Sequence, residues 1–472
     1  MQPSFALLSP HELREIDRAS RELLWDVGVQ VHDDKVLKIY QEAGAEVDFS
    51  KKVVRIPSHL VTDALNKCAP GFQLYGRDDI APLRIGGDRC YFGTIGFASF
   101  TADTVNGEHV PVTCQDLKEI IQLSDVLNPP DFILTPGTPS DVPGELSELY
   151  EFKIGLLNTR KHRVIQARDG QQLEKIFQMA SLCEGGFEAL QQKPFFSILV
   201  TLTSPLTLRE DSSDLIIKGA QNNLPLFIEA GPMCGGTAPA TMAATLIAAN
   251  AELLNSIVLA KFINPRVPLV YASWARMMDM KTAGVSHGGP EFGMFRVCTT
   301  QLAKFYNLPS GGGGILADSR QIDPQLGMEK MSTSLLPALA GTNMLLGMGL
   351  FAEENSMSKE VLMIDNEIAS YTRRVLQGVL VNDETTDLSL FKEVGPGGMF
   401  IDHKHTFDNF RKEMWLPKLS HRGMSNQPEG QAEIGIRGNA QKMIKRALVD
   451  YKSPSLPDHM EEKLEEIIRG AD

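Results

Sequence analysis

The sequence has few cysteines, and none of them is spaced as a metal site or a redox motif would require. There is no CxxC pair and no Cys/His cluster, which argues against a zinc site and against a disulfide framework. We therefore expect no bound metal, and thiols that are buried in a reducing compartment. The cysteines are Cys68, Cys90, Cys114, Cys183, Cys234 and Cys298.

Export and membrane signals are also lacking. The N-terminus has no basic segment followed by an apolar one, so we expect no signal peptide. No apolar run reaches the roughly 18 residues of a membrane helix without an interruption by glycine, proline or polar residues. The net charge is -13, with acidic and basic residues interleaved, which gives no footprint for nucleic acid. These absences predict a cytoplasmic protein that binds neither membranes nor nucleic acids.

The composition is that of an ordinary globular protein, with 43% hydrophobic and 22% charged residues over 472 positions. Ser9, Pro10 and Glu12 signal the start of a first helix, and Gly28 signals its end. Short strand-like runs follow at 29–32, 53–56 and 93–100. We predict that residues 1–115 form an N-terminal α/β elaboration packed on a larger domain.

From about residue 113, helical and strand-like patterns alternate. Repeated strand–helix units imply a parallel sheet, and their number favours an α/β fold of the (βα)8 TIM barrel type. No GxGxxG motif follows the first strand, which counts against a Rossmann fold. We predict a barrel core over 116–403 and a C-terminal helical extension over 404–472. The predicted strands are 164–166, 195–201, 225–229, 268–273, 308–311 and 361–365.

In a barrel of this type, functional groups belong at the carboxyl ends of the strands. Glu229 ends an apolar run, so its buried carboxylate would need a partner or a cation. The alternative is a structural ion pair with Arg276 or Arg296. Asp365 and Glu367 follow the last predicted strand in the same way. The alternative there is that Asp365 caps the next helix.

Two further motifs carry weaker signals. His403 and His405 would share one face of a strand, as an acid/base pair or a metal site requires, but no third ligand is present. A run of glycines lacks the lysine and serine or threonine of a phosphate loop, so it favours close approach of a ligand or a bulky partner. A flexible loop is the alternative. The run is Gly311, Gly312, Gly313 and Gly314.

Aromatic residues lie in adjoining loops near two predicted strand ends. Tyr271, Trp274 and Phe292, with His287 between them, are material for an ammonium-binding cage, because aromatic faces attract alkylammonium groups. The alternative for each is a place in the core. No GxSxG, HExxH or reactive cysteine context supports a hydrolase.

Five ordered blocks of sequence resemble the trimethylamine methyltransferase-like superfamily over nearly the whole chain. They lie at 97–117, 310–330, 339–349, 360–368 and 395–417. The resemblance implies a (βα)8 barrel that binds an amine in its central cavity while a separate corrinoid protein docks over the mouth. The founding members carry pyrrolysine, whereas all 472 positions here are standard residues. The chain therefore resembles the branch that lacks pyrrolysine, which acts on quaternary amines.

The resemblance implies that the enzyme moves a methyl group from a small quaternary amine to the Co(I) corrinoid of a cognate partner protein. No cofactor is expected to bind tightly to this chain itself. A quaternary nitrogen is already charged, so the tertiary amine leaves without a general acid, and the protein orients the methyl group and excludes water. We expect proline betaine first, then glycine betaine, carnitine or γ-butyrobetaine.

On this interpretation the candidate residues take the following places. Tyr271, Trp274 and Phe292 form the cage. Glu229, Asp365 and Glu367 form an anionic lining. A carboxylate of the substrate would bind His287, Arg296 or Arg320, and His403 and His405 would line the mouth. The corrinoid would approach over Gly311, Gly312, Gly313 and Gly314.

Two other functions stay open. A different barrel enzyme, such as a metal-dependent lyase or an aldolase, would need metal ligands or a Schiff-base lysine, and Lys261 and Lys281 lie near strand ends without a motif. A non-catalytic betaine-binding protein would use the same cage, although periplasmic binders carry a signal peptide. For either function or for the methyltransferase, a homo-oligomer is the default expectation.

Overall fold

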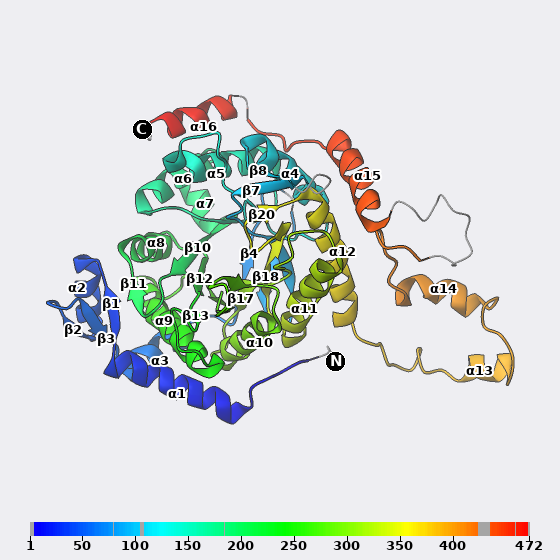
Figure 1. The fold of residues 1–472 in the computed structure, drawn as a ribbon, viewed down its shortest axis with the longest axis horizontal. Coiled ribbons are helices and arrows are strands. Elements are labelled where there is room, and N and C mark those ends of the chain that lie inside the picture. The colour runs from blue at the N-terminus through cyan, green and yellow to red at the C-terminus, as the bar shows by residue number, and fades with distance from the viewer. Residues whose placement is uncertain are drawn as a thin grey trace.

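The computed structural model describes residues 4–470 except 79, 104–107, 184, 423–434 and 458. Its centre is a sheet of seven parallel strands surrounded by helices (Figure 1). Nearly all residues of these strands are buried, which explains their continuous apolar sequences. In spatial order the strands are β6 (Tyr91–Thr94), β18 (Met344–Met348), β17 (Ser310–Gly313), β14 (Leu269–Ser273), β12 (Leu226–Ala230), β10 (Phe196–Leu202) and β9 (Arg163–Ile165).

The two edge strands of this sheet contact the same short segment of chain. Parallel bridges join Gly93 of β6 to Phe132, and Ile133 to Arg163 of β9. The backbone N–H of Val164 donates to the carbonyl of Ile133 at 3.0 Å. A side chain at position 93 would overlap the ring of Phe132, so glycine is needed there. Residues 132–133 therefore lie between β6 and β9.

Helices follow the strands along the chain and form an outer layer around the sheet (Figure 1). They are α4 (Cys114–Val126), α5 (Ser147–Asn158), α6 (Gly170–Cys183), α7 (Phe187–Gln192), α8 (Glu210–Gln221), α9 (Met242–Ile263), α10 (Pro290–Phe305), α11 (Pro324–Ala340) and α12 (Lys359–Leu376), with a 3-10 turn, η1 (Gly144–Leu146), before α5. By length and composition alone α9 could cross a membrane, but 83% of its apolar window is buried inside the protein. That burial is what a core helix shows.

Five predicted strands overlap β9, β10, β12, β14 and β17. The sixth, at 361–365, is wrong, because these residues belong to α12. The Ser358 hydroxyl accepts hydrogen bonds from the backbone N–H groups of Glu360 and Val361 and so caps that helix. Asp365 and Glu367 therefore lie on a helix and not at the end of a strand.

The N-terminal part packs against the outside of this layered core. The capping box between Ser9 and Glu12 begins α1 (Pro10–Asp26) as predicted, and α1 packs on α9. Strand β1 (Val29–Val31) pairs in parallel with β11 (Thr207–Leu208). The other elements of this part are α2 (Asp34–Glu42), β2 (Glu46–Asp48), β3 (Val53–Arg55), α3 (Ser58–Asn66), β4 (Gly71–Leu74) and β5 (Leu83–Gly86).

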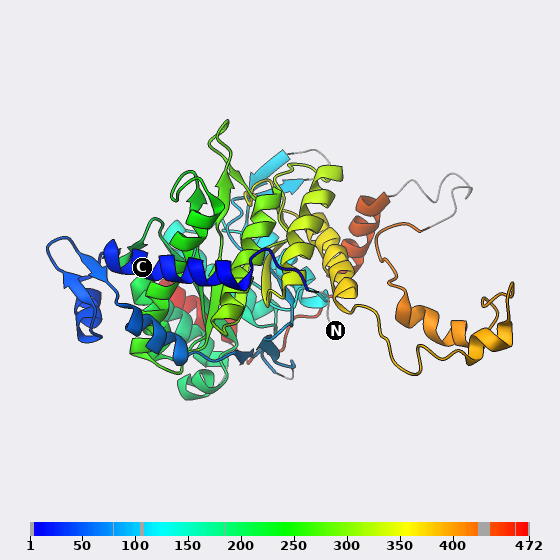
Figure 2. The same cartoon turned by 90° about the horizontal axis from the view of Figure 1, so that it is seen from below.

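Short strands cover the carboxyl ends of the central sheet, along the upper edge of Figure 2. One group is β13 (Met233–Cys234), β15 (Arg276–Met278) and β16 (Val285–Ser286). The other is β7 (Phe100–Asp103), β8 (Glu108–Pro111), β19 (Leu350–Phe351) and β20 (Ser356–Met357). These strands and their turns place polar side chains over the end of the sheet.

The C-terminal part is helical. It contains α13 (Ser389–Val394), α14 (Lys404–Glu413), α15 (Gly435–Asp450) and α16 (Met460–Arg469). α15 packs on α4 and α12, and α16 packs on α5 and α6. After α12 the chain runs away from the body of the protein through α13 and α14 (Figure 1).

Candidate active site at the carboxyl end of the sheet

Glu229 is the buried acid at the centre of the candidate site. It lies in β12 in register with Thr201 of β10 and Ala272 of β14, so these three side chains point to the same face of the sheet. One carboxylate oxygen, Oε1, accepts a hydrogen bond from the Thr201 hydroxyl at 2.8 Å. The other, Oε2, is buried without a partner. A buried oxygen without a hydrogen-bond partner is rare in folded proteins and calls for an explanation.

A second acid, Glu354, joins the aromatic and imidazole residues of the site. The indole N–H of Trp274 donates to Glu354 Oε1 at 2.8 Å, and His287 Nε2 lies 3.7 Å from Glu354 Oε2. Glu354 stands in the turn between β19 and β20 with a positive φ of 68°, after Ala352 and Glu353 with φ values of 52° and 58°. Such backbone costs about 1–3 kcal/mol per residue and is typical of functional sites. Glu354 was not predicted as a site residue, since two adjacent glutamates in a turn carry no motif.

Arg296 of α10 lies beneath the aromatic residues. Its guanidinium donates to the carbonyls of Ser273 and Ala275 and stands 4.2 Å from the centre of the Phe292 ring and 5.8 Å from that of Trp274. The ring faces predicted to cage a substrate cation therefore already hold an arginine. Trp274 and Phe292 are nevertheless brought together, with ring centres 6.5 Å apart.

Burial sets the charge state of this cluster. It raises the pKa of Glu229 to about 7, against the lowering effect of the Thr201 hydrogen bond and the nearby Arg276 and Arg296. It also lowers the pKa of Arg296 to about 9 and lowers the pKa of His287, although Glu354 raises the latter. His287 is therefore neutral near pH 7, and the acid Glu229 is poised between its two forms.

Unpartnered polar atoms gather in this cluster. Among the described residues, buried side-chain atoms without a hydrogen-bond partner include Glu229 Oε2, Arg276 Nε, both ring nitrogens of His287 and Arg296 Nε. Such atoms are rare in folded proteins and call for an explanation. Here an acceptor and several donors lie together without partners. The arrangement fits a ligand that carries both a positive and a negative group.

A surface cavity of about 590 Å³ leads to Glu354 from outside. Phe97, Phe100, His109 and Arg320 line it together with the turn at 352–356. Arg320 is exposed, so the structure places it in this entrance and not among the buried residues around Glu229. Glu354, which also contacts Trp274 and His287, is the residue that this cavity shares with the cluster.

Gly311, Gly312 and Gly313 end the buried strand β17 and Gly314 follows it, also buried, so the run is not a flexible loop. A Cβ at Gly313 would lie 2.7 Å from Phe292 and from Trp274, and one at Gly311 would lie 2.6 Å from Phe227. The missing side chains therefore make room for the aromatic rings of the cluster. The backbone of this run therefore packs against aromatic rings of the protein itself. None of the four glycines lines the surface cavity.

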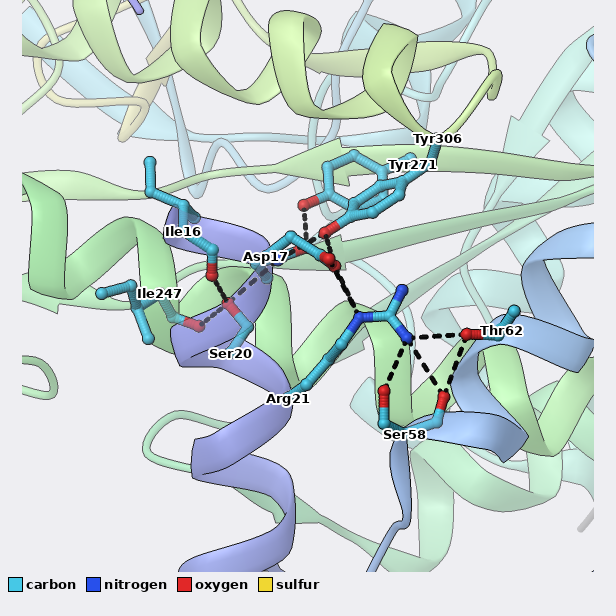
Figure 3. A network of polar contacts seen from close by, with 10 residues as sticks. Ile16, Asp17, Ser20, Arg21, Ser58, Thr62, Ile247, Tyr271 and Tyr306 are labelled. Carbon is cyan, nitrogen blue, oxygen red and sulfur yellow. Dashed lines mark hydrogen bonds and ion pairs between the residues drawn. The ribbon is translucent and has the colours of Figure 1, made fainter. Parts of the chain in front are cut away.

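Tyr271 is not brought to the site. Its neighbour Ala272 shares the face of Glu229, so Tyr271 points to the opposite face of the sheet. There its hydroxyl donates to Asn250 Oδ1 at 2.8 Å. Figure 3 shows it beside Tyr306, whose hydroxyl donates to Asp17 of α1 at 2.7 Å. Tyr271 thus helps to fasten α1 to the outer layer.

Two predicted acids have structural contacts. Asp365 forms a buried ion pair with Lys330 at 2.8 Å, and Glu367 accepts hydrogen bonds from the backbone N–H groups of Lys418, Leu419 and Ser420. The strand that these two acids were expected to follow is a helix, so the position that suggested a role at the site does not exist. Neither residue lies among the contacts around Glu229.

The two histidines of the HxH motif lie outside the site as well. His403 caps α14, where its Nδ1 accepts from the backbone N–H of His405 at 3.1 Å, so the expected strand is wrong. His403 Nε2 is 3.4 Å from Glu393 in α13. In the described part of the chain, no group of three or more His, Cys, Asp or Glu side chains could hold a metal ion.

Comparison with known proteins defines the class to which this fold and site belong. The profile of the trimethylamine methyltransferase (MTTB) family matches residues 1–470. A trimethylamine methyltransferase of Desulfitobacterium hafniense is 32% identical over 98% of this chain and 92% of its own length. A glycine betaine methyltransferase of the same species is 28% identical over 99% of this chain and 97% of its own length. The chain therefore belongs to the trimethylamine methyltransferase family, which confirms the resemblance found in the sequence.

A solved structure has a similar fold. The monomethylamine methyltransferase of Methanosarcina barkeri superposes with a TM-score of 0.51 at 13% identity, covering 98% of this chain and 92% of that one. At this identity the similarity concerns the fold alone. It agrees with the mixed α/β architecture and the parallel sheet predicted from the sequence.

Proposed function

We propose that this protein transfers a methyl group from a small betaine, a quaternary amine with a carboxylate, to the Co(I) corrinoid of a partner protein. The observation that supports it most is the cluster of unpartnered atoms around Glu229. Glu229 Oε2 has no hydrogen-bond partner, and Arg276, His287 and Arg296 near it each have at least one buried nitrogen without a hydrogen-bond partner. A zwitterion satisfies both needs at once, and a simple amine satisfies only the first.

We also propose that the central sheet works as a closed (βα)8 barrel, with the segment 132–133 as its eighth strand. The bridges from this segment to β6 and β9 support closure. The cluster around Glu229 then lies at the carboxyl end of the barrel, where enzymes of this fold carry their sites. The cavity at Phe97 and Arg320 is the entrance on the same end.

In this proposal the chain binds and orients the substrate. Arg276 and His287 hold the carboxylate, and the ionised Glu229 faces the ammonium group beside Trp274. The C–N bond breaks with its electron pair left on nitrogen, so a neutral tertiary amine leaves and no residue has to supply a proton. A corrinoid carried by a partner protein would supply the Co(I) that accepts the methyl group. The surrounding apolar residues exclude water from the transfer.

The test is anaerobic transfer to a reduced corrinoid protein, followed by the absorbance of the corrinoid. Glycine betaine, proline betaine, carnitine, γ-butyrobetaine and trimethylamine serve as donors. We expect at least one betaine to react and trimethylamine not to react. Glu229→Gln should lower kcat/KM at least about tenfold, which corresponds to about 1.4 kcal/mol of lost transition-state stabilisation.

The matched control is Glu252→Gln. Glu252 of α9 is also buried with its pKa raised to about 7, but it is hydrogen-bonded to Ser204 and Leu206 away from the cluster. Equal losses in both variants would contradict a special role for Glu229. Betaine binding without transfer to any corrinoid protein would favour a binding protein, and activity that depends on a bound metal would favour a lyase.

A further inference from the structure

Residues 379–416, here called the arm, leave the body of the protein after α12 and return to it before α15 (Figures 1 and 2). No residue from 373 to 418 is buried. The arm is nevertheless apolar, since it holds twelve of the twenty-eight large hydrophobic residues that are exposed in the described chain. These are Val379, Leu380, Val381, Leu388, Phe391, Met399, Phe400, Ile401, Phe407, Phe410, Met414 and Leu416.

The base of the arm is fixed to α12. The guanidinium of Arg374 donates to the carbonyl of Gly378 at 3.0 Å and to that of Glu413 at 2.9 Å, so one side chain holds both ends together. Close to the second end, Trp415 donates to the hydroxyl of Ser370 at 3.0 Å and packs edge-on against Tyr371. An arm with a fixed base presents its apolar side chains in one place, as a docking element does.

The exposed apolar area is large enough for a stable interface. The twelve side chains expose 36% to 82% of their surfaces, which amounts to on the order of 1,000 Å². A standard interface takes roughly 800 Å² from each partner, and single chains rarely expose apolar patches of that size without a function. We propose that the arm packs against a second copy of this chain and holds a homo-oligomer together.

Two observations favour a second copy over the partner that accepts the methyl group. In Figure 2 the arm leaves the right-hand side of the protein, below its middle, whereas the short strands over the candidate site lie along the upper edge. A partner that collects methyl groups must reach the site and dissociate again, and transient interfaces are less apolar than permanent ones. An apolar element remote from the site entrance fits a permanent contact between copies.

The experiment compares molar masses by size-exclusion chromatography with light scattering at micromolar concentration. The full chain should have at least twice the mass of a single chain. The double variant Phe391→Asp/Phe407→Asp should elute as a monomer, because both rings are largely exposed in one copy and would be buried between two. A second variant replaces residues 379–412 with a short Gly/Ser linker, which the closeness of Gly378 and Glu413 allows.

The matched control is Val449→Asp on α15, whose side chain is 77% exposed outside the arm and should leave the mass unchanged. Circular dichroism and Tm show whether each variant is folded. A monomeric full chain would overturn the proposal, as would two folded arm variants with an unchanged mass. If the full chain is monomeric and the arm variants lose only methyl transfer to the corrinoid protein, the arm belongs to that partner instead.

Discussion

Glu229 is a single carboxyl group whose charge changes within the physiological pH range. Burial raises its pKa to about 7, Glu354 adds to the rise, and the Thr201 hydroxyl and two arginines oppose it. Only the ionised carboxylate attracts an ammonium group. Below about pH 7 the Glu229 carboxyl is mostly protonated and neutral, and this attraction is lost. Binding of a cationic substrate favours the ionised form. In the proposed function, the charge of this one residue therefore links substrate binding to pH.

From this follows the pH dependence of kcat/KM with a betaine donor. It should rise with pH, approaching tenfold per pH unit below about 7, and level off above that value. Glu229→Gln should remove this step, since the amide has no charge to gain. Glu252→Gln should keep it, although the pKa of Glu252 is also raised to about 7 by burial. A step that persists unchanged in Glu229→Gln would assign the titration to another group.

The sequence showed which residues lie near the predicted strand ends. It did not show to which face of the sheet their side chains point. Glu229 and Trp274 were singled out because they lie at the ends of predicted apolar strands, and Arg296 only as a charged residue that could pair with Glu229 or with a carboxylate. The sequence did not show which face Tyr271 occupies, and in the structure its neighbour Ala272 shares the face of Glu229, since successive side chains of a strand point to opposite faces. Glu354 was missed because its contact with Trp274 joins positions 80 residues apart.

At the scale of elements, a buried ion pair ties two helices to two strands. Lys330 of α11 and Asp365 of α12 are both fully buried. Lys330 Nζ also donates to the carbonyl of Ile315, just after β17, at 2.8 Å. Asp365 Oδ2 accepts from the backbone N–H of Gly349, just after β18, at 2.7 Å. The pair thus fixes the chain near the turn that carries Glu354.

Lys330→Met should lower the free energy of unfolding by about 3–5 kcal/mol, because it leaves the Asp365 carboxylate buried without a cation. The double variant Lys330→Met/Asp365→Leu should recover most of this loss, since no charge then remains in the interior. Urea denaturation of the three proteins measures the difference. Additive losses in the double variant would show that the two residues do not act as a pair.

The same elements show where sequence patterns reach their limit. Five strands were predicted because runs of buried apolar residues between turns are typical of parallel sheets. The run at 361–365 has the same composition, and periodicity does not separate a short buried strand from a turn of buried helix. Ser358 was the sequence signal that favoured a helix, because serine is a preferred N-cap residue. In the structure its hydroxyl accepts hydrogen bonds from the backbone N–H groups of Glu360 and Val361.

At the scale of the whole molecule, the family could be predicted from similar blocks spread along the chain. The fold class could be predicted because strand and helix patterns alternate repeatedly. The arm was not, because exposure depends on what the rest of the fold leaves uncovered. Its block at 395–417 was among the segments that resemble the family, yet no residue in it is buried. A family-like sequence on an exposed apolar arm agrees with a role in assembly.

Ligand binding should stabilise the molecule as a whole, because a ligand that binds only the folded state adds RT ln(1 + [L]/Kd) to its stability. At about 100 times Kd a betaine should add about 2.7 kcal/mol and raise Tm by a few degrees. Choline, a quaternary amine without a carboxylate, should give a smaller shift because it leaves the donors of Arg276 and His287 without a partner. Glu229→Gln should reduce the shift and Glu252→Gln should not. Equal shifts with choline and with betaines would mean that the cation alone is recognised, and that the unpartnered donors around Glu229 serve another purpose.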